Sequence, residues 1–335
     1  MTRKYSDLMI LGLAMLAVFL LMWLLNGSQF FHIGNFQSMA FQLPELGILS
    51  LAMMITMLTG GINLSIISSA NLSGIIIAMI LTHFITPETG AAGSGGVILL
   101  ALAAGLTTSA AIGLLNGFLI AVVDVSPILA TLGTMILVRG LCIVLTKGYV
   151  ISGFPEPLLF IGNGLILGIP VPIIIFGLVA GLTALLLNRT PLGVNIYMLG
   201  SNPTACHFAG VNNTRVLIRT YLLSGLYAGI AAIIMIARFN SAKADYGESY
   251  LLMTVLASVL GGTSAAGGFG RVSGLVLALV ILQLVSSGLN LLRVSAFLTI
   301  AIWGLILILV MVVNHLTARY QERSSPAREK KRQMT

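Results

Sequence analysis

Charged residues are scarce in this sequence. Only 8% of its 335 residues are Asp, Glu, Lys or Arg, whereas 58% are hydrophobic and the mean hydropathy is +1.06. A soluble domain cannot cover its surface with so few charges, so the composition predicts a polytopic membrane protein. Stretches such as residues 168–187 are apolar without the alternation of a β-barrel strand. The predicted fold class is therefore all-α.

The sequence also lacks the motifs of common enzymes and metal sites. Its two cysteines, Cys142 and Cys206, lie far apart and belong to no Cys/His cluster, which argues against a disulfide or a bound metal. No P-loop, HExxH or GxSxG motif is present, so we expect no enzyme activity and no cofactor on this chain. Arg139 is the clear ionisable residue within a span, which disfavours a proton-coupled pump. Glu45 and His83 fall near predicted span ends, where snorkelling to the interface is expected.

Apolar runs predict about ten transmembrane helices in a single transmembrane domain over residues 1–335. Residues 27–42 are predicted as an interfacial aromatic segment, residues 86–96 as a glycine-rich loop and residues 148–168 as a polar loop. The predicted spans are residues 8–25, 43–59, 69–85, 97–123, 127–147, 170–187, 216–237, 250–260, 272–291 and 296–314.

Basic residues predict the orientation. Ten spans place both termini on one side, and twelve basic residues fall on that side against four on the other. The excess predicts that residues 1–7, 189–215 and 315–335 are cytoplasmic. The charge of the tail fits anionic lipid headgroups, and nucleic acid is not expected as a partner. The twelve are Arg3, Lys4, Arg189, Arg215, Arg219, Arg271, Arg319, Arg323, Arg328, Lys330, Lys331 and Arg332; the four are Lys147, Arg238, Lys243 and Arg293.

Residues 199–213 form a short polar stretch between two apolar spans. Asn202 can cap a helix, Pro203 suits its first position, and Gly210 can adopt the left-handed conformation after its end. We expect a helix of roughly two turns over residues 203–209, too short and polar to span a bilayer. Such a helix at the membrane surface suits contact with a soluble cytoplasmic partner. A structured loop without a partner is the alternative.

Two glycine pairs interrupt the apolar pattern. Gly60-Gly61 follows the second span and Gly261-Gly262 follows the eighth, so the helices are expected to be broken or short there. Interrupted spans at matching positions are typical of a midplane binding site in a transporter. The alternative is that these glycines only allow close helix packing. By the span count both breaks face the same way, so an inverted repeat is not predicted.

Three passages, in this order, resemble those of a known family. They are Gly60-Gly61-Ile62-Asn63-Leu64-Ser65 with Ser68; Gly200, Asn202, Ala205, Gly210 and Val211; and residues 259–270 with Arg271 and Gly274. Over nearly the whole chain the sequence resembles the membrane permease subunits of ATP-driven (ABC) carbohydrate importers of the ribose type. That group includes related pentose, hexose and autoinducer uptake systems. The sequence departs from the family pattern at Asn63, where the family has Asp, at Ile67 and at Ser201, where it has glycine.

The resemblance implies an importer that works by alternating access. Its expected partners are a separate ATPase subunit that binds ATP and magnesium, an extracellular sugar-binding protein, and a second permease, identical or homologous. The ATPase would dock on the helix at 203–209, shaped by Asn202 and Gly210, with Thr204, Cys206 and His207 facing the partner. The coupling residues implied are Asn202, Pro203, Thr204, Ala205, His207 and Gly210.

Polar residues within the spans are the candidates for the substrate path. Amide and hydroxyl side chains can bond the hydroxyls of a sugar, although they can equally bond one helix to another. The candidates are Asn63, Ser65, Asn71, Ser73, Asn116 and Asn290.

Other functions stay open at this stage. One is a branched-chain amino-acid or nucleoside permease with the same energy source. Another is a channel or secondary transporter that needs no ATPase, and a third is a membrane scaffold without transport.

Overall fold

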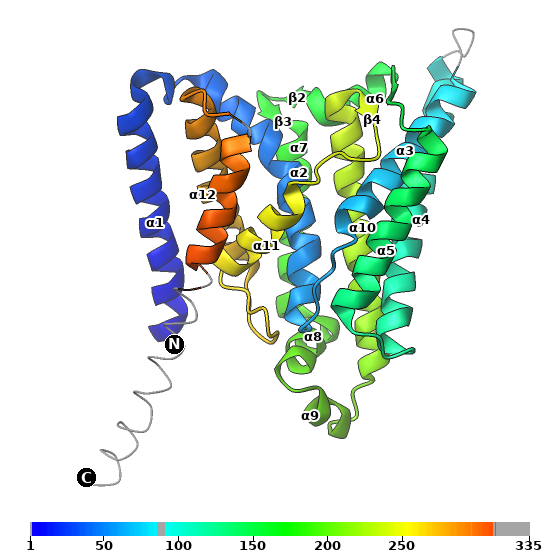
Figure 1. Ribbon diagram of the computed structural model, residues 1–335, viewed down its shortest axis with the longest axis vertical. Coiled ribbons are helices and arrows are strands. Elements are labelled where there is room, and N and C mark those ends of the chain that lie inside the picture. The colour runs from blue at the N-terminus through cyan, green and yellow to red at the C-terminus, as the bar shows by residue number, and fades with distance from the viewer. Residues whose placement is uncertain (1, 86–90, 296, 311, 313–335) are drawn as a thin grey trace. The chain divides into compact units, whose positions relative to one another are not determined.

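The computed structural model describes residues 2–85, 91–295, 297–310 and 312. Helices make up most of this part of the chain and the strands have two residues each, which confirms the all-α class (Figure 1). Eight of the helices described are long and apolar enough to cross a membrane. They are α1 (Thr2–Asn26), α2 (Ile33–Leu58), α3 (Ile66–Phe84), α4 (Ala91–Ala121), α5 (Pro127–Thr146), α7 (Val171–Arg189), α10 (Asn213–Phe239) and α12 (Val272–Leu291).

Shorter elements connect these helices. Strand β1 (Ile151–Ser152) pairs antiparallel with β4 (Ser241–Ala242), and β2 (Leu165–Ile166) with β3 (Ile169–Pro170). The predicted eighth and tenth spans are shorter apolar helices, α11 (Tyr250–Leu260) and Phe297–Val310. The others are η1 (Gly27–Gln29), α6 (Glu156–Asn163), α8 (Pro191–Ser201) and α9 (Pro203–Phe208).

The chain divides into two compact units. The first, Met1–Leu292, holds α1 to α12, and the second is Arg293–Thr335. The predicted basic tail at residues 315–335 lies outside the described residues, as do residues 86–90 of the predicted glycine-rich loop.

The bundle of the first unit has two distinct ends (Figure 1). At one end lie α8, α9 and the first turns of α1, and here the Gly268 amide donates a hydrogen bond to Leu58 O (3.0 Å). At the other end lie β1 and β4, where the Phe154 amide donates to Asn240 Oδ1 (2.9 Å). We call these the α8 end and the β4 end.

α10 is the central helix and packs mainly on α2, α3 and α4. α4 and α10 approach so closely that a Cβ on Gly113 would overlap Tyr221 O, and a Cβ on Gly225 would overlap Ser109 O. Only small residues let two helix backbones come this near. The centre of the bundle is therefore held by contact between backbones as well as by side chains.

α2 and α10 run in opposite directions. Ser224 Oγ of α10 donates to Ala52 O, whereas Arg238 further along α10 donates to Phe41 O, earlier in α2. Each long helix is followed by a non-helical stretch, residues 59–65 or 240–249, and then by a shorter helix, α3 or α11. The prediction about direction concerned the two glycine pairs, Gly60-Gly61 and Gly261-Gly262, and both pairs lie at the same end of the bundle, as expected.

Three predicted boundaries also change. Residues 33–42 of the predicted interfacial segment 27–42 belong to α2, whose first turn is capped by His32 Nδ1 accepting from the Gly34 amide (3.2 Å). Residues 91–96 of the predicted loop 86–96 are helical, because the apolar surroundings of a span tolerate glycine in a helix. The predicted polar loop 148–168 contains β1, α6 and β2.

Candidate functional sites

Helix α9 is defined by local signals at both ends. Asn202 Oδ1 accepts a hydrogen bond from the Ala205 amide (3.0 Å), and Pro203 occupies the first helical position. Gly210 follows the helix in the left-handed region, with φ of +79°. The predicted helix at 203–209 is thus confirmed, and it ends one residue earlier, at Phe208.

The outer surface of α9 is mixed in character. Thr204, Ala205 and His207 are exposed, and Phe208 is 84% exposed. Cys206, in contrast, is 1% exposed and packs inward. The prediction that Cys206 faces a partner is therefore wrong, because a helix this short must use one face to hold itself against the bundle. The remaining face exposes polar, small and aromatic groups.

α8 meets the bundle through a contact between backbones that we call the glycine joint, made by Leu58, Gly60, Gly200, Gly267 and Gly268. A Cβ on Gly200 would overlap Leu58 O and lie 2.5 Å from the Gly268 amide nitrogen. A Cβ on Gly267 would lie 2.8 Å from both Gly200 O and the Gly60 nitrogen. The joint therefore fastens the end of α8 to the end of α2 and to the loop before α12.

The first predicted break, Gly60-Gly61, lies at the α8 end in this joint. The second, Gly261-Gly262, follows α11 at the same end, where a Cβ on Gly261 would lie 2.7 Å from the backbone of Leu275. Gly261 therefore permits close packing of backbones, whereas Gly60 and Gly262 adopt left-handed φ angles of +81° and +83° that favour glycine.

Tyr197 makes a second tie between α8 and the loop before α12. Its hydroxyl donates to Gly270 O (2.9 Å), beside a cavity of about 420 Å³ at the α8 end. Burial raises the pKa of Tyr197 above its ordinary value, and the nearby Arg271 lowers it in part. Tyr197 consequently stays a hydrogen-bond donor at neutral pH.

Three of the predicted path residues, Asn63, Ser65 and Asn116, meet in one buried network. Asn63 Nδ2 donates to Ser224 Oγ (3.0 Å), and Ser65 Oγ donates to Asn63 Oδ1 (2.8 Å). Asn116 Nδ2 donates to Ser65 Oγ (2.8 Å), and Ser224 Oγ donates to Ala52 O (2.9 Å). The network joins residues 59–65 to α2, α4 and α10. Ser224 was not predicted, since a lone serine in a span carries no signal in the sequence.

Changing Asn63 to leucine should destabilise the protein more than changing Asn116 to leucine. The Asn63 amide makes three hydrogen bonds, with Ser224 Oγ and with the backbone and side chain of Ser65, whereas Asn116 makes one. We expect the free energy of unfolding to fall by about 2 kcal/mol in Asn63→Leu and by less than about 1 kcal/mol in Asn116→Leu. Unfolding in detergent measures both values. Unchanged stability of both variants with reduced uptake would instead favour direct contact with a substrate.

Asn71 lies apart from this network, against the stretch before α11. Its Nδ2 donates to Ala244 O and Tyr246 O, each at 3.0 Å. Beside it is a cavity of about 200 Å³, on whose wall Arg139 forms an ion pair with Glu248. These two side chains are 53% and 50% exposed. The cavity is lined by Ile67, Ser68, Asn71, Met135, Arg139, Ala244, Glu248 and Leu251.

The last two predicted path residues lie elsewhere. Ser73 Oγ donates to Gly105 O (2.8 Å) and so joins α3 to α4. Asn290 is exposed near the end of α12. Among the six predicted path residues, Asn71 is the one that lines the 200 Å³ cavity.

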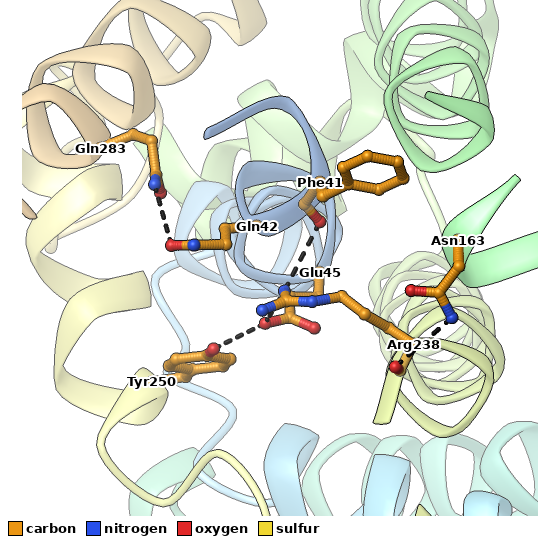
Figure 2. Close-up of polar contacts among 7 residues, drawn as sticks. All are labelled: Phe41, Gln42, Glu45, Asn163, Arg238, Tyr250 and Gln283. Atoms are coloured by element: carbon orange, nitrogen blue, oxygen red, sulfur yellow. Dashed lines mark hydrogen bonds and ion pairs between the residues drawn. The ribbon is translucent and has the colours of Figure 1, made fainter. Parts of the chain in front are cut away.

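A buried carboxylate lies between α2, α10 and α11 (Figure 2). Glu45 is fully buried, and its Oε1 lies 2.8 Å from Arg238 Nη1 and accepts a hydrogen bond from the Tyr250 hydroxyl (2.6 Å). Arg238 also donates to Phe41 O (3.5 Å). The prediction that Glu45 snorkels to the interface is wrong, because α2 begins at Ile33 and Glu45 therefore lies well inside the helix.

These features define a polytopic membrane protein, with a bundle of apolar helices, polar groups buried in its interior and a capped helix presented at one end. The chain belongs to the family described as branched-chain amino acid transport system / permease component, which matches residues 35–313. Its relatives confirm the predicted resemblance to the permeases of carbohydrate ABC importers and indicate the bacterial inner membrane.

The similarity to these relatives covers most of each chain. The sequence is 35% identical over 306 residues to the ribose import permease protein of Bacillus subtilis, 91% of both chains. It is 37% identical over 290 residues to the ribose import permease protein of Escherichia coli, 85% of this chain and 87% of the relative. It is 32% identical over 273 residues to an autoinducer 2 import system permease protein of Yersinia enterocolitica, 80% and 79% of the two chains. No solved structure matches the sequence.

Proposed function

We propose that this chain is the permease subunit of an ATP-driven importer that moves a sugar or sugar-like molecule across the cytoplasmic membrane. The observation that carries the proposal is the similarity to a ribose import permease over 91% of the chain. In this proposal a separate subunit binds ATP and magnesium and supplies the energy, while this chain supplies the path.

The α8 end is the cytoplasmic end in this proposal. The starts of α1 and α10, the junction of α7 with α8 and the start of α12 carry basic residues at that end, and the β4 end carries Lys147, Arg238 and Lys243. Basic residues concentrate on the cytoplasmic side of membrane proteins. The N-terminus, α8, α9 and, by the count of spans, the C-terminus would then be cytoplasmic. The basic residues of the α8 end are Arg3, Lys4, Arg189, Arg215, Arg219 and Arg271.

The ATPase subunit docks on α9 in this mechanism. Asn202, Pro203 and Gly210 shape the helix, and the exposed faces of Thr204, Ala205 and His207 contact the ATPase. Closure of the ATPase pair on nucleotide moves α8 and α9. The glycine joint passes that motion to α2 and to the loop before α12, so that access to the path alternates between the two sides of the membrane.

The path runs along the surface that carries Arg139 and Glu248. Arg139 lies about 18 Å along α5 from Pro127, which places it well inside a hydrocarbon layer about 30 Å thick. A half-exposed charged pair at that depth is costly against lipid, so it faces a water-filled path that a second permease closes. Both an identical and a homologous second copy fit this requirement.

The predicted path residues take different parts in this proposal. Asn71 contacts the sugar from the cavity wall, and Asn63, Ser65, Ser73 and Asn116 hold the start of α3 in place behind it. Asn290, at the β4 end of α12, lies on the side where an extracellular sugar-binding protein delivers the sugar.

Removing the charge of Arg139 should reduce uptake more strongly than it reduces assembly. The variant Arg139→Gln leaves Glu248 without its ion-pair partner in the path, and we expect a loss of about tenfold or more in the initial rate of uptake. The double variant Arg139→Gln with Glu248→Gln should recover part of the rate, because no charge is left unpaired. Arg189→Gln, an exposed basic residue at the α8 end, is the control. Normal uptake by Arg139→Gln would remove this surface from the path.

A complementation experiment tests the function: uptake is measured in cells from which this protein has been deleted and in the same cells after it has been restored. ATP-dependent uptake of labelled ribose or a related sugar in the restored cells alone is the expected result. Uptake that survives depletion of ATP would instead indicate a channel or a secondary transporter.

The family description favours a second candidate, a branched-chain amino-acid permease. Labelled leucine in the same cells separates the two. Uptake of leucine without uptake of sugar would replace the sugar proposal and keep the ATP-driven mechanism.

A further inference from the structure

Residues 240–249, between α10 and α11, form part of the wall of the 200 Å³ cavity, and we call them the strap. Ala244 and Glu248 of the strap line the cavity. The carbonyl groups of Ala244 and Tyr246 accept the two hydrogen bonds from Asn71. The position of the strap therefore sets both the shape of the cavity and the orientation of the Asn71 amide.

Both ends of the strap are attached to the same carboxylate oxygen (Figure 2). Arg238, in the last turn of α10, precedes the strap and lies 2.8 Å from Glu45 Oε1. Tyr250, the first residue of α11, follows the strap and donates to Glu45 Oε1 at 2.6 Å. Glu45 belongs to a third element, α2, so this one oxygen fixes the two ends relative to each other and to the bundle.

Stability alone does not explain a carboxylate at this place. A buried ion pair often stabilises a protein no more than apolar side chains of similar volume, because both charges lose their hydration. Glu45 Oε2 is buried and has no hydrogen-bond partner among the described residues, which adds to that cost. Bonds to an ionised oxygen are short and strongly directional, however, so they define the positions of both donors.

We propose that Glu45 is a positioning residue of the substrate path: it clamps the two ends of the strap and so holds the cavity wall formed by Asn71, Glu248 and Leu251. The role of Glu45 in a substrate path rests on the proposed import function. The attachment of the strap to Glu45 can be measured without transport.

The test measures how well the clamp shields Leu251, a partly buried residue of the cavity wall next to Tyr250. Leu251→Cys is introduced into the full chain in nanodiscs, and its rate of reaction with a maleimide is recorded. The two native cysteines are both buried. Tyr250→Phe removes one donor with little change of shape, and Glu45→Gln weakens both ties. We expect each to raise the rate about tenfold, as loss of a charge-assisted hydrogen bond predicts.

The matched control is a neutral contact of the same helix. Gln283 Nε2 donates to Gln42 Oε1 (3.2 Å), one turn before Glu45 and on the side of α12 (Figure 2). Gln283→Leu should leave the maleimide rate unchanged. Unchanged rates in both Tyr250→Phe and Glu45→Gln would overturn the proposal, and if Glu45→Gln does not fold, Tyr250→Phe decides.

A double variant separates positioning from charge balance. Glu45→Gln with Arg238→Met removes both charges, so we expect the Tm to return toward the native value. The maleimide rate should stay raised, because the ends of the strap are no longer joined. A rate that returns to the native value would show that Glu45 only neutralises Arg238, and would overturn the proposal.

Sugar uptake by the same variants links the clamp to function, with an expected loss of about tenfold or more if the cavity wall must be held in place. Raised maleimide rates in a chain whose native form imports no sugar would retain the clamp and reject the proposed function. Raised maleimide rates with normal sugar uptake would reject the role of Glu45 in the path.

Discussion

Changing Ala205 to glutamate is expected to release the ATPase subunit from this chain while the membrane bundle stays folded. Ala205 is exposed on α9, and a negative charge in the first turn of a helix does not weaken the helix itself. Burying that unpaired charge in an interface costs about 3 kcal/mol, or more than about a hundredfold in affinity. Purification of tagged protein in mild detergent, with mass spectrometry of the bound subunits, measures the effect.

The control for this variant adds the same charge at the opposite end. Leu167 is 98% exposed in the turn between β2 and β3, so Leu167→Glu should keep the ATPase bound. Loss of the ATPase from both variants would indicate general damage to assembly. An ATPase that stays with Ala205→Glu would mean that α9 is not its docking site.

Adding a single methyl group at Gly200 is expected to abolish coupled transport. The new Cβ would overlap Leu58 O and crowd the Gly268 amide, and both are backbone atoms that cannot rotate away. We expect Gly200→Ala to destabilise the protein by about 3 kcal/mol and to open the glycine joint. ATP hydrolysis by the assembled complex should then continue while sugar uptake falls to background. Hydrolysis and uptake measured on the same preparation reveal this separation.

Gly177 provides the matched control for Gly200. Both glycines are helical, but a Cβ on Gly177 of α7 would have no atom within 4 Å. Gly177→Ala should therefore be neutral, or stabilising by up to about 1 kcal/mol, because alanine is the better helix former. Normal coupling in Gly200→Ala would show that motion of α8 reaches the bundle by another route.

The features of this fold that depend on residues close together in the sequence were predictable. The spans follow from runs of apolar residues, and α9 follows from a cap, a proline and a glycine within nine positions. Each signal acts over one or two turns of helix, so the sequence displays it directly. The start of α2 was predicted ten residues late because its first turns carry aromatic and polar side chains.

Partners that lie far apart in the chain were not predictable. Glu45 and Tyr250 are separated by 205 residues, and nothing in the sequence around either residue indicates that the two are in contact. Asn63 finds Ser224 across 161 residues, in a helix that is otherwise ordinary. Polar residues within spans could be found, but the side chains that they contact could not, because those contacts depend on how α2, α3 and α10 pack.

The backbone contact between α4 and α10 also determines how the protein responds to its lipid. α4 has 31 residues and α10 has 27, about 46 and 40 Å of helix, whereas the hydrocarbon layer is about 30 Å thick. A helix longer than this layer tilts to match it. Because Gly113 and Gly225 hold the two backbones together, the helices cannot tilt separately. A change in bilayer thickness would therefore reorient α4 and α10 as one body, together with the start of α3 that Asn116 and Ser224 hold.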